Sequence, residues 1–131
     1  MQKYLPIPES TEYLAKQVVD AAFKVHKRFG PGLYESVYER CLVHELRKRG
    51  LDVKYQVLVP VIYEELQIDD AFRLDIVVNN DLIIEGKAVD EMKPIFKTQV
   101  LTYLRLTEKR LGLLINFNVE LIKDGIERIV N

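Results

Sequence analysis

Cysteine is nearly absent from this chain of 131 residues, in which Cys41 is the only one. A lone cysteine cannot form an intramolecular disulfide, so the fold has to hold without one, as is typical of proteins in a reducing cytosol. Cys41 is therefore expected to serve as a small residue of the core.

An excess of positive charge is also lacking, because 19 Lys and Arg residues oppose 20 Asp and Glu residues and give a formal net charge of -1. Proteins that coat nucleic acid rely on many contacts between basic side chains and phosphates, and this balance argues against that class. A local basic groove is still compatible with the composition.

Long apolar runs are missing as well. The first ten residues, MQKYLPIPES, lack the run of about 7–15 apolar residues that a secretory signal requires. No later stretch approaches the roughly 20 apolar residues of a membrane span. We therefore expect a cytoplasmic protein with no membrane partner.

The residues that are present have the composition of a globular protein, with 48% hydrophobic and 30% charged residues. A chain of this length typically forms one domain and buries roughly two thirds of the surface that it exposes when unfolded. We predict a single domain over residues 1–131.

Apolar residues recur at three- and four-residue spacing in the first part of the chain, which is typical of helices with one buried face. A helix is predicted over residues 14–29, ending at Gly30 and Pro31, and a second over residues 33–49, ending at Gly50. The short link FGPG between them predicts a helical hairpin. The positions expected to face inward are Leu14, Val18, Ala21, Ala22, Val25 and Phe29 in the first helix and Leu33, Val37, Cys41, Leu42 and Leu46 in the second.

The pattern then changes to alternation of apolar and polar residues over 53–61, which predicts a strand. Pro60 has no N–H to give to a ladder, so this strand is expected at a sheet edge or with a bulge. Two further apolar runs, 72–78 and 82–89, flank a three-residue polar link and predict a β-hairpin.

Beyond the hairpin, apolar residues from Ile95 to Leu106 fit a helix, and the continuous apolar run 111–117 is typical of a buried strand. Residues 126–130 are expected to add an edge strand. Two helices, three strands, a helix and a strand in this order predict an α/β fold with a mixed central sheet flanked by helices.

Three charged residues interrupt the apolar strands of the predicted hairpin. Asp75 lies within FRLDIVV, and Glu85 and Lys87 lie two apart within LIIEGKAV, so Glu85 and Lys87 share one face of the sheet. An Asp–Glu pair supplies the hard oxygen ligands that Mg²⁺ or Mn²⁺ prefers, and a nearby lysine can orient water and offset charge on a phosphate. Edge-strand charges or a partly buried ion pair are the structural alternative.

Three motifs in this sequence resemble those of a known family. Asp75 followed by Glu85-Gly86-Lys87 is similar to the D…(D/E)-x-K signature of the PD-(D/E)XK nuclease superfamily. The stretch GLYESVY at 32–38 is similar to the pattern that names the GxxExxY protein family, and QVLTY at 99–103 to the Q-x-x-x-Y motif of the exonuclease branch. The resemblance covers about residues 10–130 and implies the superfamily's α/β core. One departure is Gly86, which stands where a larger apolar residue is usual, and is expected to reduce packing on the opposite face and to weaken the site.

The resemblance also implies roles for individual residues. Asp75 and Glu85 would be metal ligands, the backbone carbonyl of Gly86 a third ligand, and Lys87 the water-activating residue. Glu35 would bind the metal through water or hold a second ion. The alternative for Glu35 is an exposed glutamate in the first turn of a helix, where the helix dipole favours it.

Other residues are expected to contact substrate or to serve the fold. Gln99 and Tyr103 lie four apart, on one helix face. The resemblance to the exonucleases implies that this face borders the active site and helps to place a nucleic-acid strand. The alternative is that Tyr103 is a core aromatic and Gln99 a bystander. His26 would reach the metal, as a histidine of this region does in some exonucleases, or would be an ordinary surface or capping residue. Gly32 and Tyr38 are expected to serve the helix turn and the packing. Lys97 belongs to a positively charged side of the helix and its end, which is formed by Lys93, Lys97, Arg105, Lys109 and Arg110. This side is expected to contact phosphates or, alternatively, to be an ordinary solvated surface.

These observations predict a metal-dependent phosphodiesterase acting on nucleic acid, DNA in preference to RNA, without strong sequence specificity. Two alternatives stay open. One is a nuclease-derived binding module with little turnover, and the other is a structural or oligomerisation domain that recruits a partner protein. Homo-oligomerisation is compatible with each of them.

Overall fold

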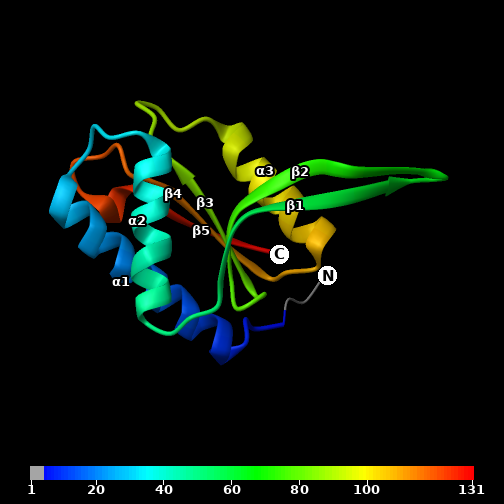
Figure 1. Cartoon of the computed structure of the whole chain (residues 1–131), viewed down its shortest axis with the longest axis horizontal. Helices are drawn as coiled ribbons and strands as arrows, with labels where there is room; N and C mark the ends of the chain where they lie inside the picture. Colours follow the sequence, from blue (N-terminus) through cyan, green and yellow to red (C-terminus); the bar gives the residue numbers. More distant parts are fainter. Residues whose placement is uncertain (1–4) are drawn as a thin grey trace.

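The computed structural model describes residues 5–131 and has the predicted α/β architecture, with three helices and a five-stranded mixed sheet (Figure 1). The elements are α1 (Glu9–Phe29), α2 (Glu35–Lys48), β1 (Val53–Tyr63), β2 (Leu66–Val78), β3 (Leu82–Lys87), α3 (Pro94–Thr107), β4 (Leu111–Asn116), the 3₁₀ helix η1 (Ile122–Gly125) and β5 (Ile126–Val130). The prediction of fold class is confirmed. Within the described part of the chain, no helix is both long and apolar enough to span a bilayer.

The sheet has the strand order β1-β2-β3-β4-β5, in which β3 and β4 are parallel and the other neighbours antiparallel. A parallel pair requires a crossover, and α3 supplies it between β3 and β4. One apolar cluster joins α1 and α2 to the sheet through residues such as Val18, Leu42 and Ile84. A second cluster joins α3 to the sheet through Val100 and Leu104. Helices therefore cover both faces.

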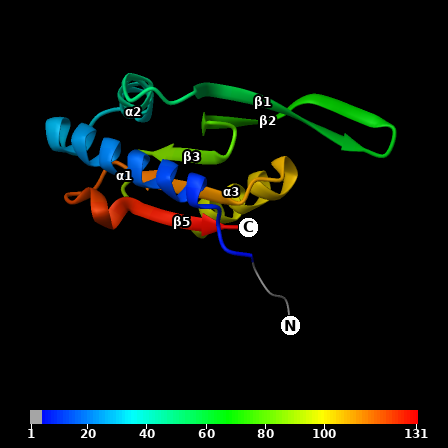
Figure 2. The same cartoon turned by 90° about the horizontal axis from the view of Figure 1, so that it is seen from below.

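Strands β1 and β2 extend well beyond the sheet as a two-stranded ribbon, which we call the hairpin arm (residues 57–74; Figures 1 and 2). Strand β2 pairs with β3 only through residues 76–78, whereas its pairing with β1 continues from Val57–Leu74 to Tyr63–Leu66 at the tip. Strand β1 lies at the edge of the sheet and its register shifts between Val59 and Val61, so the expectation of an edge position or a bulge at Pro60 is confirmed.

Several residues predicted to face inward are exposed or half-buried. Phe29, Leu33 and Val37 expose 46%, 38% and 37% of their surface, and Cys41 is half-buried. Helix α2 begins at Glu35 rather than at residue 33, so Leu33 lies in the link before it. The sheet-facing positions of α2 are Tyr38, Glu39, Leu42, Val43 and Leu46, which turns Val37 and Cys41 onto the flank that faces α1. The predicted core role of Cys41 is thus only partly correct.

Candidate active site

Asp75 and Glu85 lie side by side on the antiparallel strands β2 and β3, where Ile76 is the register partner of Ile84. The Asp75 backbone N–H donates to Glu85 Oε1 at 3.2 Å, and the Gly86 N–H donates to Asp75 Oδ2 at 3.2 Å. Glu85 is only 7% exposed although its side chain is ionisable. The hairpin therefore places the two carboxylates against each other.

A cavity of about 430 Å³ opens beside this pair. It brings together six residues singled out in the sequence, which are Glu35, Asp75, Glu85, Lys87, Gln99 and Tyr103. The base of the hairpin arm forms another wall through Leu58, Asp70, Phe72 and Arg73, which sequence reasoning missed. Elements α2, β2, β3, α3 and the arm thus enclose one polar cavity.

Helix α3 and the hairpin arm meet at this cavity. The ring of Tyr103 stacks on that of Phe72 with centroids 4.6 Å apart and planes 8° apart. The Lys87 ammonium lies 4.4 Å from the centroid of the Phe96 ring, a distance typical of a cation–π contact. The Phe72–Tyr103 stack thus holds the base of the arm against α3, and the Phe96 ring packs on the Lys87 ammonium.

Glu39 is a further acidic residue at the site, and sequence reasoning missed it. Carboxylate oxygens of Glu35, Glu39 and Asp75 all lie within 4.8 Å of one another. Glu39 is 4% exposed, and its Oε1 accepts a hydrogen bond from the Tyr55 hydroxyl at 3.2 Å. Its Oε2 is buried without a hydrogen-bond partner among residues 5–131. The one signal in the sequence is the four-residue spacing from Glu35, which places both on one helix face.

Burial and the nearby charge of Asp75 raise the pKa values of the three glutamates at the site. Burial, followed by the nearby charge of Asp75, raises the pKa of Glu39 to about 8. The same two causes, in the same order, raise the pKa of Glu85 to about 9. Burial also raises the pKa of Glu35, and Asp75 adds to the effect. A divalent cation would offset this repulsion and give Glu39 Oε2 a partner, so these oxygens suit the hard cations Mg²⁺ and Mn²⁺.

The Glu39 side chain occupies space that is open because Gly86 has no side chain. Side chains alternate along β3, so position 86 faces α2 while Glu85 and Lys87 face the cavity. A Cβ at position 86 would lie 3.2 Å from Glu39 Cγ and 3.4 Å from Glu39 Oε2. The expectation of poorer packing at Gly86 is therefore wrong, because the Glu39 side chain fills the position.

Gly32 and Tyr38 anchor the start of α2. Gly32 has φ of 110°, in the range that favours glycine. The Tyr38 hydroxyl donates to Gly30 O and accepts from the Leu33 N–H, while its ring stacks on Phe117 with centroids 4.7 Å apart. This arrangement fixes the first turns of α2 and hence the positions of both glutamates of that helix.

Two other residues singled out in the sequence lie apart from the cavity. His26 is buried, and its Nε2 is 2.7 Å from the backbone oxygen of Val119. Lys97 forms an ion pair with Glu127 at 3.1 Å. Neither is among the residues that line the cavity of Asp75 and Glu85.

The raised pKa values predict that the metal-free protein loses stability as the pH rises. Between about pH 5 and the folded-state pKa values of about 8 for Glu39 and about 9 for Glu85, the folded state holds protons that the unfolded chain has released. The free energy of unfolding should therefore fall across this window, and the melting temperature should be several degrees higher near pH 6 than near pH 9. Thermal unfolding with a chelator present measures this. Glu39→Gln should flatten the slope, and an unchanged slope would mean that Glu39 does not contribute.

Comparison with curated proteins and with solved structures gave no significant match. Comparison with protein families gave a match to the family described as the PD-(D/E)XK nuclease superfamily, over residues 12–129. This range includes every carboxylate of the cavity and Lys87. A match over so much of the chain, together with the observed fold, makes this protein a member of the PD-(D/E)XK nuclease superfamily.

Proposed function

We propose that this chain is a metal-dependent phosphodiesterase that hydrolyses nucleic acid, DNA in preference to RNA, and that it belongs to the GxxExxY branch of its superfamily. The observation that carries the proposal is the convergence of Asp75, Glu85 and Glu35 with Lys87 at one cavity. It is backed by the Glu39 oxygen, which is buried without a hydrogen-bond partner in the described part of the chain. Burying several carboxylates together costs free energy, because they lose water and repel one another. Such clusters are typical of sites where a cation or a reaction requires them.

The oxygens of Asp75 and Glu85 and the carbonyl of Gly86 would hold Mg²⁺ or Mn²⁺, with Glu35 and Glu39 completing the acidic cluster. When bound, such an ion polarises a phosphoryl oxygen and lowers the pKa of water. Lys87 would orient the attacking water and offset the negative charge that grows on the phosphate. Its contact with the Phe96 ring fixes the ammonium at the cavity edge.

Gln99, Tyr103 and Arg73 would hold the substrate at the cavity rim. Arg73 brings a positive charge for a phosphate, and Tyr103 presents an aromatic ring already stacked on Phe72. The sequence contains no motif of the kind that reads base edges in a groove. Cleavage that depends on strand ends or structure, rather than on sequence, fits this set of residues.

The direct test is incubation with single- and double-stranded DNA and RNA in Mg²⁺ or Mn²⁺, with Asp75→Ala as the control. Cleavage by the wild type that chelator and Asp75→Ala both abolish supports the proposal. Equal cleavage by Asp75→Ala would point to a contaminant. Tight binding with no cleavage in any arm would favour the catalytically weak binding module instead.

Metal binding should also be visible as stability. A ligand that binds only the folded state stabilises it by about 2.7 kcal/mol at a hundredfold excess over Kd, so millimolar Mn²⁺ should raise the melting temperature by several degrees. Asp75→Ala should melt at or above wild type without metal, because repulsion is relieved, and should gain little from Mn²⁺.

The matched control for this measurement is Glu120→Ala, which removes an exposed carboxylate outside the cavity. It should respond to Mn²⁺ as the wild type does. Equal responses of wild type and Asp75→Ala would show that the ion binds elsewhere.

A further inference from the structure

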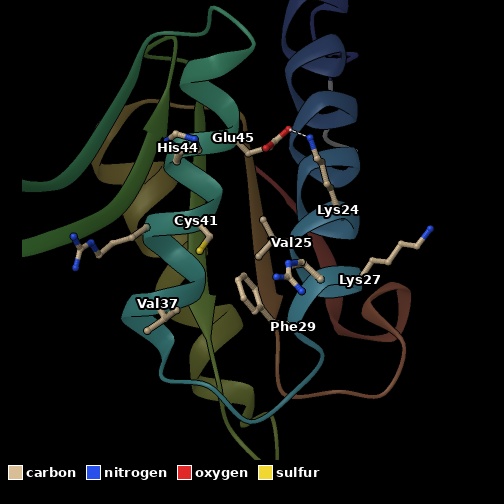
Figure 3. A pocket seen from close by; sticks show the side chains of 10 residues that line it. Lys24, Val25, Lys27, Phe29, Val37, Cys41, His44 and Glu45 are labelled. Atoms are coloured by element: carbon tan, nitrogen blue, oxygen red, sulfur yellow. Dashed lines mark hydrogen bonds and ion pairs between the residues drawn. The ribbon is translucent and has the colours of Figure 1, made fainter.

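An apolar groove runs between α1 and α2, separate from the cavity of Asp75 and Glu85 (Figure 3). It has a volume of about 820 Å³. Val25, Phe29 and Cys41 point into the space between the two helices, and Val37 lines the α2 side. Phe29 and Val37 remain 46% and 37% exposed. The groove therefore offers apolar surface that nothing in residues 5–131 covers.

The rim of this groove is basic. Lys24, Lys27, Arg28, Arg40 and His44 all line it. Its one acidic residue, Glu45, is already paired with Lys24 at 3.0 Å. Among the ion pairs of residues 5–131, none includes Lys27, Arg28 or Arg40. A fitting occupant would have apolar side chains flanked by carboxylates.

The tip of the hairpin arm has this character. Ile62, Tyr63 and Leu66 expose 71%, 67% and 57% of their surface. Residues 62–69, IYEELQID, contain three acidic residues and no basic one. None of those three carboxylates forms an ion pair with another of residues 5–131.

An isolated two-stranded ribbon is only marginally stable in water. The base of the arm packs against α3 through Phe72 and Tyr103, but residues 62–69 at the tip are all exposed and have no third strand beside them. Exposed apolar residues at its tip add surface that favours burial against another body. The tip carboxylates disfavour two alternatives, contact with phosphates and packing of two tips against each other, because both would bring like charges together. The surface complementary to the arm tip is therefore one that is apolar and has a basic rim.

We propose that the arm tip of one chain docks into the α1–α2 groove of a second copy of this chain. The tip lies on the opposite side of the molecule from α1 and α2, so a chain's own groove is out of reach (Figure 1). Ile62, Tyr63 or Leu66 would enter the apolar floor, and Glu64 and Glu65 would meet Lys27, Arg28 and Arg40 at the rim. The contact joins two different surfaces, and it closes into a dimer when two copies exchange arms.

Charge reversal on either surface separates this contact from other modes of association. Glu64→Lys with Glu65→Lys reverses the tip, and Lys27→Glu with Arg28→Glu reverses the groove. Each double variant should weaken self-association of the full chain by roughly tenfold or more in Kd, measured by sedimentation equilibrium at low salt. Circular dichroism and thermal unfolding establish that each variant is folded.

Two mixed experiments restore complementarity and make the inference specific. A chain carrying both reversals should associate as the wild type does. An equimolar mixture of the tip-reversed and groove-reversed variants should form a one-to-one complex, although each alone is largely monomeric. Asp81→Lys serves as the control, because Asp81 is an exposed carboxylate in the turn between β2 and β3, lines neither surface and should leave association unchanged when it is replaced.

The inference is overturned by any of three results. These are a wild type that stays monomeric at about 100 µM, association that neither reversal weakens, and failure of the combined reversals to restore it. None of these measurements uses nucleic acid or metal, so the outcome is independent of the proposed nuclease activity.

Discussion

Replacement of Lys87 by alanine is expected to reduce nucleic-acid cleavage by roughly 100- to 1,000-fold, the loss typical of removing one group that stabilises developing charge. The carboxylate oxygens stay in place, because Asp75 and Glu85 are held by backbone N–H groups rather than by the lysine. The rise in melting temperature with Mn²⁺ should therefore be largely kept. Single-turnover cleavage and thermal unfolding with and without Mn²⁺ measure the two effects.

Two further variants make this result specific to the ammonium. Lys87→Met keeps an unbranched stem next to the Phe96 ring and loses only the charge, so it should be as inactive as Lys87→Ala. Lys123→Ala removes a lysine outside the cavity and should cleave as the wild type does. Near-wild-type turnover by Lys87→Ala would show that its proposed role is wrong.

Gly86→Leu is expected to destabilise the fold by about 1–3 kcal/mol, as overpacking of a closed site usually does. Even a Cβ at this position would lie 3.2 Å from Glu39 Cγ, and a leucine has three more carbons to place. The Glu39 carboxylate would be displaced from Asp75, so the stabilisation by Mn²⁺ should fall as well. Urea unfolding with and without Mn²⁺ gives both quantities.

A double-mutant cycle with Glu39→Ala assigns the effect to this pair of residues. Without the Glu39 side chain, the leucine has room, and Gly86→Leu should cost at least about 1 kcal/mol less than it does in the wild type. Equal costs in the two backgrounds would mean that the leucine meets other atoms and that Glu39 does not depend on Gly86.

The part of the site that sequence could predict is the part made by local geometry. Alternation along a strand puts Glu85 and Lys87 on one face, and a three-residue link brings Asp75 beside them. These relations need no knowledge of how distant elements pack. The fold class followed from the same kind of pattern, since the periods of helices and strands and their order left few arrangements.

Glu39 escaped prediction because its burial depends on a residue far along the chain. A glutamate between Tyr38 and Arg40 in an amphipathic helix has the usual appearance of a solvated position. It is buried because the missing side chain of Gly86 leaves space on β3 for it. The places of His26 and Lys97 are likewise set by distant partners, Val119 and Glu127, which no local pattern indicates.

The sequence pattern predicted only part of the two strands that form the hairpin arm. Residues 53–61 and 72–78 have apolar patterns, but residues 62–71 carry four acidic side chains and no regular alternation. Alternation reports a strand with one buried face, and a free ribbon has solvent on both faces over this stretch. The strands continue there through pairing with each other alone.

Strand β2 belongs both to the arm and to the central sheet, and Asp75 lies at the point where one passes into the other. A displacement of the arm would therefore act, through this one strand, on a carboxylate of the acidic cluster. Affinities at two sites of one protein are linked reciprocally. If a docked arm changes the affinity for Mn²⁺ by some factor, Mn²⁺ must change the affinity of docking by the same factor. The concentration of the chain would then set its metal occupancy, and the supply of metal would set its degree of assembly.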